Sequence, residues 1–205
     1  GSTPAKPGLF PFDGKHVVTT NETTRNPFLP AEVIIVGGGI IGCEFATVYS
    51  ELGRKVTLVE MLDSLCPNLD KDVTREITKS LKQRGVEIMT STKITAMKVE
   101  GETVVAQLEG KGELRAGMAL VAVGRKPVTE GIGLENVGVE MDGAIIKVDD
   151  RSKTSAAGVY AIGDCACRQQ YAHVASRMGI VAVENIMGHN SRDDLSVVVA
   201  AVYTH

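Results

Sequence analysis

The sequence predicts an α/β fold, in which helices cover a parallel β-sheet that also carries an antiparallel β-meander. The β-branched residues Val33–Val36 run directly into a glycine-rich turn and a helical pattern. A second apolar strand, Val56–Glu60, follows that pattern, and short strands separated by turns come later in the chain. A strand, a tight turn, a helix and a second strand in this order are typical of a Rossmann-like nucleotide-binding domain.

Composition and charge are those of an ordinary globular chain, with 205 residues of which 43% are hydrophobic. Acids and bases are interspersed and the net charge is −3, which argues against a nucleic-acid partner or a membrane-binding face. The longest apolar runs, Val33–Val36 and Val197–Tyr203, have the length of strands, so no membrane span is expected. Cysteines without disulfide-framework spacing favour a reducing compartment, namely the cytoplasm, or the mitochondrial matrix in a eukaryote.

The first part of the chain predicts alternating strands and helices. Gly1–Pro30 holds five of the seven prolines and is interpreted as an extended lead-in. Helices are predicted over Ile40–Leu52 and Asp70–Arg84, each followed by a glycine, and Val86–Met89 is the third parallel strand. Helical spacing predicts that the first helix buries Ile41, Phe45, Val48 and Leu52, and that the second buries Val73, Ile77 and Leu81.

The pattern then changes to antiparallel strands. Ile94–Val99 and Val104–Leu108 are separated by a turn, and Glu109–Gly112 forms a further turn. Met118–Val123 is apolar throughout, as expected of a buried strand that returns to the parallel sheet. These elements complete a nucleotide-binding domain over residues 13–123.

After Gly124 the sequence predicts a smaller unit. Ala144–Val148 and Gly158–Ile162 are expected to be strands, and Ala172–Met187 a helix. The helix would turn Ile180, Val183 and Met187 to one face. These elements are too few for a complete layered domain, so we expect them to be part of one.

The glycine-rich turn carries the spacing Gly-x-Gly-x-x-Gly at Gly37, Gly39 and Gly42. In a dinucleotide site the first glycine makes the tight turn, the second lets a pyrophosphate approach the backbone, and the third packs the helix on the sheet. The free N–H groups at the start of the helix would hold the pyrophosphate. Glu60 would bind the ribose hydroxyls, and since no arginine stands among the next three residues, NAD is favoured over NADP.

Several segments resemble the flavin-dependent pyridine nucleotide–disulfide oxidoreductases. The glycine turn and the acidic end of the second strand resemble that family's NAD site. Further segments resemble the exit from its NAD domain, its second flavin motif and the Ala-His beside its flavin: Val121–Pro127, Thr154–Asp164 and Ala172–Ala175. The resemblance implies a remnant of an FAD domain over residues 1–12, an NAD domain over 13–123, a second part of the FAD domain over 124–195, and the start of a dimerisation domain over 196–205.

The resemblance also implies site residues. For NAD these are Gly37, Gly38, Gly39, Ile40, Ile41, Gly42, Glu44, Glu60, Ile94, Ala122, Val123, Gly124 and Arg125. Glu44 would lie near the nicotinamide and the flavin, whereas Arg125 could equally be a surface arginine and Ile94 a core residue. Asp164 would bind the flavin ribityl chain and Ala172 would contact the ring edge. On its own, Asp164 also fits a turn-capping aspartate.

The implied function is hydride transfer between NAD and FAD coupled to dithiol–disulfide exchange, in redox homeostasis, most closely as in the lipoamide-linked members of the family. A lipoyl-bearing protein and a homodimer partner would then be the macromolecular partners. The family's redox-active Cys-x4-Cys, its first flavin motif and its His-x4-Glu dyad do not occur in these 205 residues, so we expect the chain alone to be inactive. An NADH oxidase, a mercuric reductase, a transhydrogenase or a non-catalytic NAD-binding module remain alternatives.

The cysteines do not predict a metal site. Cys165-x-Cys167, with His173 six residues later, lacks both Cys-x2-Cys spacing and a fourth ligand. Cys43 and Cys66 are expected to behave as small hydrophobic residues.

Overall fold

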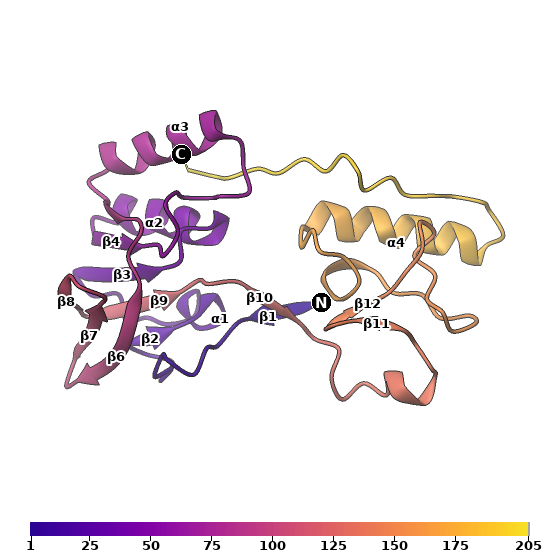
Figure 1. The fold of residues 1–205 in the computed structure, drawn as a ribbon, viewed down its shortest axis with the longest axis horizontal. Coiled ribbons are helices and arrows are strands. Elements are labelled where there is room, and N and C mark those ends of the chain that lie inside the picture. Colours follow the sequence, from indigo (N-terminus) through magenta and orange to yellow (C-terminus); the bar gives the residue numbers. More distant parts are fainter. Residues whose placement is uncertain (205) are drawn as a thin grey trace. The chain divides into compact units, whose positions relative to one another are not determined.

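The computed structural model describes residues 1–204 and divides the chain into two compact units (Figure 1). The larger unit comprises Pro4–Gly124 and the segment that begins at Ala200, and the smaller comprises Gly1–Thr3 and Arg125–Val199. His205, which the sequence assigned to the start of a dimerisation domain, lies outside the described residues. In the part of the chain that is described, no helix is both long enough and apolar enough to cross a membrane.

A parallel sheet forms the centre of the larger unit and confirms the predicted fold class. Its strand order is β2-β9-β3-β4-β5, and each neighbouring pair is parallel. The strands are β2 (Val17–Val18), β9 (Met118–Val121), β3 (Glu32–Val36), β4 (Lys55–Val59) and β5 (Glu87–Met89). The short strand β2 falls within the segment that the sequence suggested was an extended lead-in, because two residues are too few to give a periodic signal.

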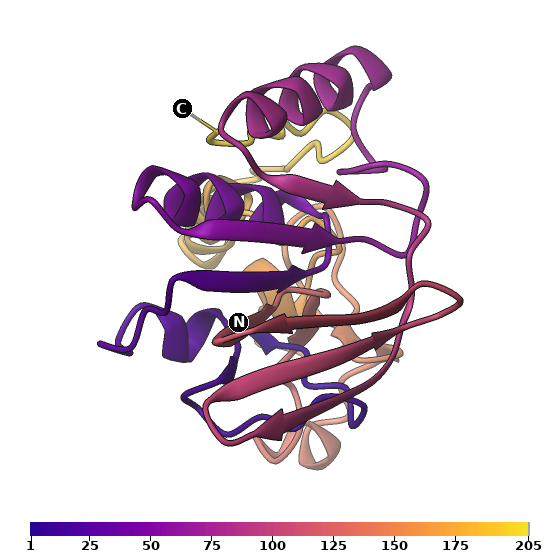
Figure 2. The ribbon, with the colours of Figure 1, turned by 90° about the vertical axis from the view of Figure 1, so that its left-hand side faces the viewer.

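The two faces of the sheet are covered differently. Val33 and Ile35 of β3 share a core cluster with α2 (Ile40–Glu51) and α3 (Lys71–Gln83). Their neighbours Ile34 and Val36 pack instead against the antiparallel meander, as expected from the twofold alternation of a strand. The meander strands, β6 (Ile94–Glu100), β7 (Thr103–Leu108) and β8 (Gly112–Ala116), lie side by side in Figure 2.

The buried face of α2 differs from the predicted one. Val48 and Leu52 are 47% and 55% exposed, whereas Cys43, Ala46 and Tyr49 are buried. The prediction was wrong because a glycine contact, and not the largest apolar side chains, sets the rotation of this helix. A Cβ built on Gly42 would lie 1.9 Å from the Gly37 carbonyl oxygen, so Gly42 lies directly against the turn. Residues on the same side of the helix as Gly42, such as Ala46 and Tyr49, therefore face the sheet.

The other two helices show the same kind of difference. In α3, Ile77 and Leu81 are buried as predicted, but Val73 is 46% exposed. The helix α4 (Ala172–Ile186) of the smaller unit is apolar on two faces, and the unit packs the face that carries Val174 and Met178 into its core. The apolar face that the sequence indicated is the exposed one, with Ile180, Val183 and Met187.

The smaller unit contains short elements around α4. Strand β1 (Ser2–Pro4) pairs with β10 (Arg125–Pro127), and β11 (Met141–Asp142) pairs with β12 (Ile145–Ile146). The 3-10 helices η1 (Leu134–Asn136) and η2 (Gly163–Cys165) complete the unit. The strand predicted over Gly158–Ile162 is reduced to a single bridge between Lys153 and Tyr160. A strand forms a ladder only where a second extended segment runs beside it, and within the described residues this segment pairs at one position.

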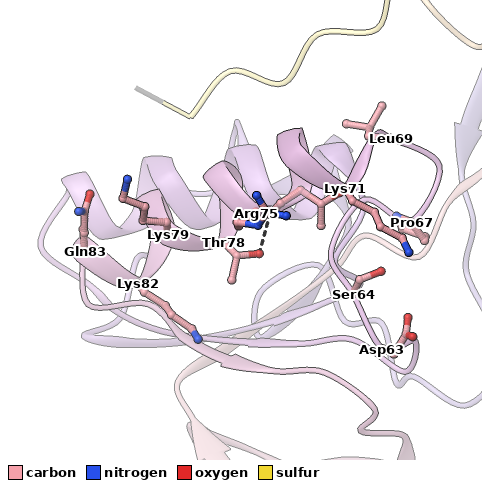
Figure 3. A pocket seen from close by; sticks show the side chains of 11 residues that line it. Asp63, Ser64, Pro67, Leu69, Lys71, Arg75, Thr78, Lys79, Lys82 and Gln83 are labelled. Carbon is pink, nitrogen blue, oxygen red and sulfur yellow. Dashed lines mark hydrogen bonds between the residues drawn. The ribbon is translucent and has the colours of Figure 1, made fainter.

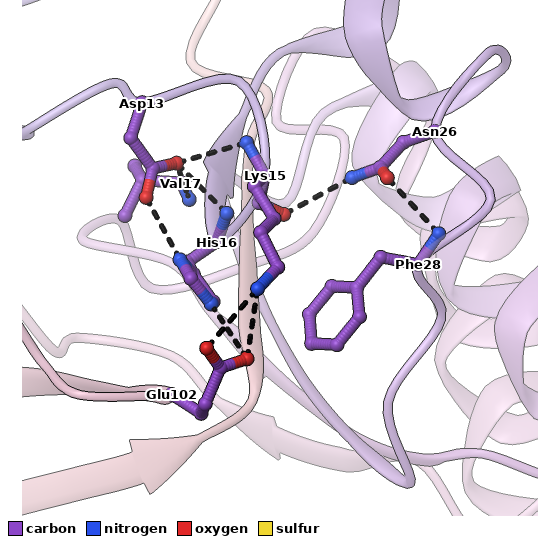
Figure 4. Close-up of polar contacts among 7 residues, drawn as sticks. All are labelled: Asp13, Lys15, His16, Val17, Asn26, Phe28 and Glu102. Carbon is purple, nitrogen blue, oxygen red and sulfur yellow. Dashed lines mark hydrogen bonds and ion pairs between the residues drawn. The ribbon is translucent and has the colours of Figure 1, made fainter.

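Asp13 and the buried His16 tie the N-terminal segment of the larger unit to the meander (Figure 4). Asp13 Oδ1 accepts the backbone N–H groups of Lys15, His16 and Val17 at 3.0, 2.8 and 2.8 Å. The His16 ring lies between two carboxylates, with Nδ1 2.9 Å from Asp13 Oδ2 and Nε2 3.3 Å from Glu102 Oε2. Burial opposes ionisation of Asp13, but the hydrogen bonds from the backbone and from His16 outweigh it and lower the pKa of this carboxyl from 3.8 to about 2.

This depressed pKa predicts an acid-dependent loss of stability. The ionised form of Asp13 stabilises the fold fully above its unfolded pKa near 3.8, and that contribution disappears as the pH falls through about 2. Urea unfolding of wild type and of Asp13→Asn, measured from pH 5 to pH 2, should therefore give a steeper fall for wild type. Asp13→Ala should lose about 1 kcal/mol or more at pH 7, because the part-buried N–H groups of His16 and Val17 lose their acceptor. Parallel curves for wild type and Asp13→Asn would contradict this reading.

The contact at Gly42 predicts a stability difference between two glycines of the same turn. Gly42→Ala should destabilise the chain by about 1–3 kcal/mol in urea unfolding, because the added methyl meets backbone that must move. Gly39→Ala is the matched control, since a Cβ there has no neighbour within 4 Å among the described residues. Equal stabilities of the two variants would show that α2 does not depend on this contact.

Candidate dinucleotide site

The glycine turn between β3 and α2 is closely packed at Gly37 and Gly38 and open at Gly39. Gly37 has a φ of +105°, and a Cβ on it would lie 2.5 Å from the Ala122 carbonyl oxygen. Gly38 is equally confined, because a Cβ there would lie 2.6 Å from Leu65 Cδ2. By contrast, nothing in the described chain comes within 4 Å of a Cβ built on Gly39. The turn is therefore filled on its protein side and free at the residue where a ligand would approach.

The helix that follows begins at a glycine, which has no side chain to cap it. Gly39 is the N-cap of α2, and within the described residues no side chain caps it and no acid stands in the first turn. The helix α3 is built in the usual way, with Asp70 accepting the Asp72 N–H at 2.9 Å. The N–H groups at the start of α2 are thus left to a ligand or solvent, and the helix dipole favours a negatively charged group there.

Glu60 stands directly after β4 and beside the glycine turn. Its side chain is 8% exposed. Oε2 accepts the Gly38 N–H at 2.6 Å and Oε1 accepts the Leu62 N–H at 2.7 Å. Two backbone N–H donors compensate the burial of this carboxylate and hold it at the edge of the turn, which is the place where a ribose would follow a pyrophosphate.

The exit of β9 borders the same turn. The Ala122 N–H donates to the Val36 carbonyl oxygen at 2.8 Å, which places Ala122 against the start of the turn. Val123 is 42% exposed, and the Gly124 carbonyl oxygen accepts the Ala5 N–H at 3.0 Å. Ile94, at the start of β6, is 6% exposed and belongs to the core between sheet and meander.

Glu44, half-buried in the first turns of α2, has a partner that the sequence did not indicate. Its Oε1 accepts the Tyr203 N–H at 3.1 Å. The segment around Tyr203 packs on the larger unit, since Val202 contacts the core cluster and the Thr204 carbonyl oxygen accepts the Ser80 hydroxyl at 3.3 Å. Ile40 and Ile41 are half-buried at the start of the helix. A contact across 159 residues leaves no periodic or spacing signal in the sequence.

In the smaller unit, the predicted site residues Arg125 and Asp164 meet through Ser2. Arg125 donates from Nε to Ser2 Oγ at 2.7 Å and from Nη2 to the Ser2 carbonyl oxygen at 2.8 Å. The Ser2 hydroxyl in turn donates to Asp164 Oδ2, and Arg125 Nε lies 4.0 Å from the same oxygen. Sequence reasoning missed Ser2 as a member of this cluster. Ala172 is exposed at the first position of α4.

The cysteines of the smaller unit have separate partners. The Cys165 thiol donates to the Ile162 carbonyl oxygen at 3.3 Å, and the Cys167 thiol lies 3.1 Å from Gln169 Oε1. Burial raises the pKa of Cys167. The His173 ring stacks on Tyr171 with centroids 5.4 Å apart.

A groove of about 1060 Å³ lies along α3 (Figure 3). It is lined by α3 and by the loop that precedes it: Asp63, Ser64, Pro67, Leu69, Lys71, Thr74, Arg75, Thr78, Lys79, Lys82 and Gln83. Its cations are partly paired within the helix, as Arg75 is with Asp72 at 3.0 Å. The groove is thus a feature of the α3 surface, separate from the glycine turn.

Comparisons with known proteins agree with the geometry. Residues 1–179 match the family model of the pyridine nucleotide-disulphide oxidoreductases. A dihydrolipoyl dehydrogenase of Bacillus subtilis is 36% identical over 212 aligned residues, covering 99% of this chain and 45% of that protein. Another of Acholeplasma laidlawii is 42% identical, covering 84% of this chain and 51% of that protein.

Solved structures give the same result. The crystal structure of LpdA from Mycobacterium tuberculosis matches with a TM-score of 0.92 at 32% identity, over 100% of this chain and 45% of that protein. An NAD-dependent persulfide reductase from A. fulgidus matches with a TM-score of 0.82 at 28% identity, over 94% of this chain and 39% of that protein. The chain therefore spans about half the length of the proteins it resembles. Since the family model covers most of its length, this chain belongs to the pyridine nucleotide–disulphide oxidoreductases.

Proposed function

We propose that the larger unit binds NAD(H) across the glycine turn. The observation that carries this proposal is the combination of the open position at Gly39, the uncapped start of α2 and the Glu60 carboxylate 2.6 Å from the Gly38 N–H. The N–H groups of Ile40, Ile41 and Gly42 would hold the pyrophosphate. The Glu60 carboxylate would accept the ribose hydroxyls and repel a 2′-phosphate.

Further residues are assigned to the same ligand. Ala122, Val123 and Gly124 would border it at the exit of β9, and Arg125 follows them in sequence. Ile94 would contact the adenosine from the start of β6. Glu44 would lie near the nicotinamide, where its carboxylate could orient the ring; the Tyr203 N–H holds one of its oxygens in place.

The smaller unit is proposed to be part of an FAD-binding domain, with residues 13–123 as the NAD domain and residues 1–12 and 124–195 on the flavin side. Ser2 and Arg125 hold Asp164 in place, and a fixed carboxylate with further lone pairs suits the hydroxyls of a ribityl chain. Ala172 is exposed at the start of α4, where a small side chain leaves room for a flat ring. The exposed apolar face of α4 is consistent with a larger surrounding domain, which would cover Ile180, Val183 and Met187.

For the whole protein we propose dihydrolipoyl dehydrogenase activity, supported by relatives of that name at 36% and 42% identity. The bound cofactors would supply hydride transfer coupled to dithiol–disulfide exchange, while this chain positions them and excludes water. A lipoyl-bearing protein would be the substrate partner and a second copy the dimer partner, in the cytoplasm or the mitochondrial matrix. The 205 residues alone are proposed to be inactive.

Binding titrations test the cofactor assignment. Wild type should bind NADH at least tenfold more tightly than NADPH, measured by fluorescence enhancement of the reduced nicotinamide. Glu60→Arg should reduce this preference at least tenfold, or about 1.4 kcal/mol, because the repulsive carboxylate is replaced by a phosphate-binding cation. Glu60→Gln removes the charge and keeps an acceptor for one of the two backbone N–H groups, so it should lower the preference, with circular dichroism reporting whether the fold is kept.

The control for this titration is Glu109→Arg, which makes the same charge change at an exposed turn of the meander. It should leave the preference unchanged. If both Glu60 variants discriminate as wild type does, Glu60 is not the ribose ligand. If wild type binds neither nucleotide while circular dichroism shows a folded chain, the proposed function itself is wrong.

Turnover assays test the inactivity of the chain. The purified 205-residue chain should not oxidise dihydrolipoamide with NAD, because it encodes neither a Cys-x4-Cys nor a His-x4-Glu pair. The longer protein that contains it should do so, and Glu44→Gln in that protein should slow flavin reduction by NADH in stopped-flow measurements. Turnover by the 205-residue chain, or unchanged flavin reduction in the variant, would contradict these assignments.

A further inference from the structure

Two buried thiols are in contact beneath the glycine turn. Cys43 Sγ, in the first turn of α2, lies 3.7 Å from Cys66 Sγ, in the loop that follows β4. The two residues are 0% and 3% exposed, and both belong to the core cluster on the helix side of the sheet. Both are free thiols. A separation of 3.7 Å is van der Waals contact between sulfurs.

The backbone fixes this contact. The Cys66 N–H donates to the Gly38 carbonyl oxygen at 2.8 Å, and Cys43 Sγ lies 3.5 Å from the same oxygen. Leu65, 1% exposed, packs on Gly38 from the same loop. Cys66 also has a φ of +44°, a left-handed conformation that a cysteine rarely adopts. The loop therefore holds a strained backbone conformation in which the two sulfurs face each other.

The two thiols are chemically unequal. The contact with the Cys43 sulfur lowers the pKa of Cys66 despite its burial. That same contact, together with burial, raises the pKa of Cys43. The thiolate is the reactive form of cysteine. Cys66 also lies in a loop next to exposed residues, whereas Cys43 is 0% exposed within α2, so Cys66 is the sulfur that reacts first and Cys43 is placed to react second.

We propose that Cys43 and Cys66 are a modification site at which a hydroperoxide forms a reversible intrachain disulfide. Cys66 sulfur attacks the peroxide, so that an S–O bond forms, the O–O bond breaks, and water or an alcohol leaves. Cys43 then attacks Cys66 sulfur, so that the S–S bond forms and the S–O bond breaks, and water leaves with the Cys43 proton. The two thiols lose two electrons and the peroxide gains them.

The local structure allows both steps. Pro67 and Asn68, next to Cys66, are exposed, so opening of a few loop residues brings a molecule as small as hydrogen peroxide to the sulfur. Closing the bond requires the sulfurs to move from 3.7 Å to about 2.05 Å, within reach of side-chain and loop adjustment. The disulfide would close a ring that contains β4 and Glu60 and would attach the loop covalently to α2.

Peptide mapping tests the proposal on the 205-residue chain without any nucleotide. The reduced, desalted chain is exposed to hydrogen peroxide, denatured with N-ethylmaleimide and digested with trypsin, which cleaves between the two cysteines at Arg54 and Lys55. We expect one linked pair of peptides that carries Cys43 and Cys66, the loss of two of the four thiols, and their return with dithiothreitol.

Matched variants separate this site from the other cysteines. The double variant Cys165→Ala/Cys167→Ala should form the linked peptides as wild type does. In Cys66→Ala, a change in a loop, hydrogen peroxide should not remove two thiols. The proposal is overturned if wild type keeps Cys43 and Cys66 fully alkylated after peroxide, if the lost thiols are Cys165 and Cys167, or if the linkage forms between chains. The wild-type map decides even if a variant fails to fold.

Discussion

The packing of Gly42 against the Gly37 carbonyl is the constraint on which the rest of the larger unit depends. A Cβ on Gly42 would lie 1.9 Å from the Gly37 carbonyl oxygen, so α2 can begin against the turn only through glycine. This contact sets the rotation of the helix and therefore chooses Cys43, Ala46 and Tyr49 as its buried face. The same contact fixes the position of Gly39, the open N-cap of the helix. The packing of α2 on the sheet therefore also determines the geometry of the candidate site.

A buried charge supplies the second constraint. Removing a carboxylate from water is costly unless hydrogen-bond donors replace the solvent. Glu60 obtains two such donors from the backbone of the turn and of its own loop, at 2.6 and 2.7 Å. These contacts keep the carboxylate fixed at the end of β4. A ligand that adds hydroxyl donors to its remaining lone pairs would bind a preorganised group, without the cost of ordering it.

Patterns within one element were predictable, and contacts between distant segments were not. The run Val33–Val36, the glycine spacing and the acid at position 60 gave the strand, turn and second strand correctly, because each depends on neighbouring residues. The buried face of α2 was predicted wrongly, and the spacing of α4 did not indicate which apolar face is buried, since both helices carry apolar residues on more than one side and only the contacts select one. Ser2 joins Asp164 across 162 residues, and no periodicity records such a pair.

Gly38 contacts both the proposed ribose-binding carboxylate and the proposed thiol pair. Its N–H donates to Glu60, while its carbonyl oxygen accepts the Cys66 N–H and contacts the Cys43 thiol. The carboxylate proposed for the ribose and the thiol pair proposed for oxidation therefore share the two sides of one residue. Any movement of Cys66 toward Cys43 acts on the Gly38 carbonyl, whose peptide unit carries the Gly39 N–H, whereas the N–H that Glu60 accepts belongs to the peptide unit before it. The thiol pair and the carboxylate thus contact adjacent peptide units of the same turn, on either side of the Gly38 Cα.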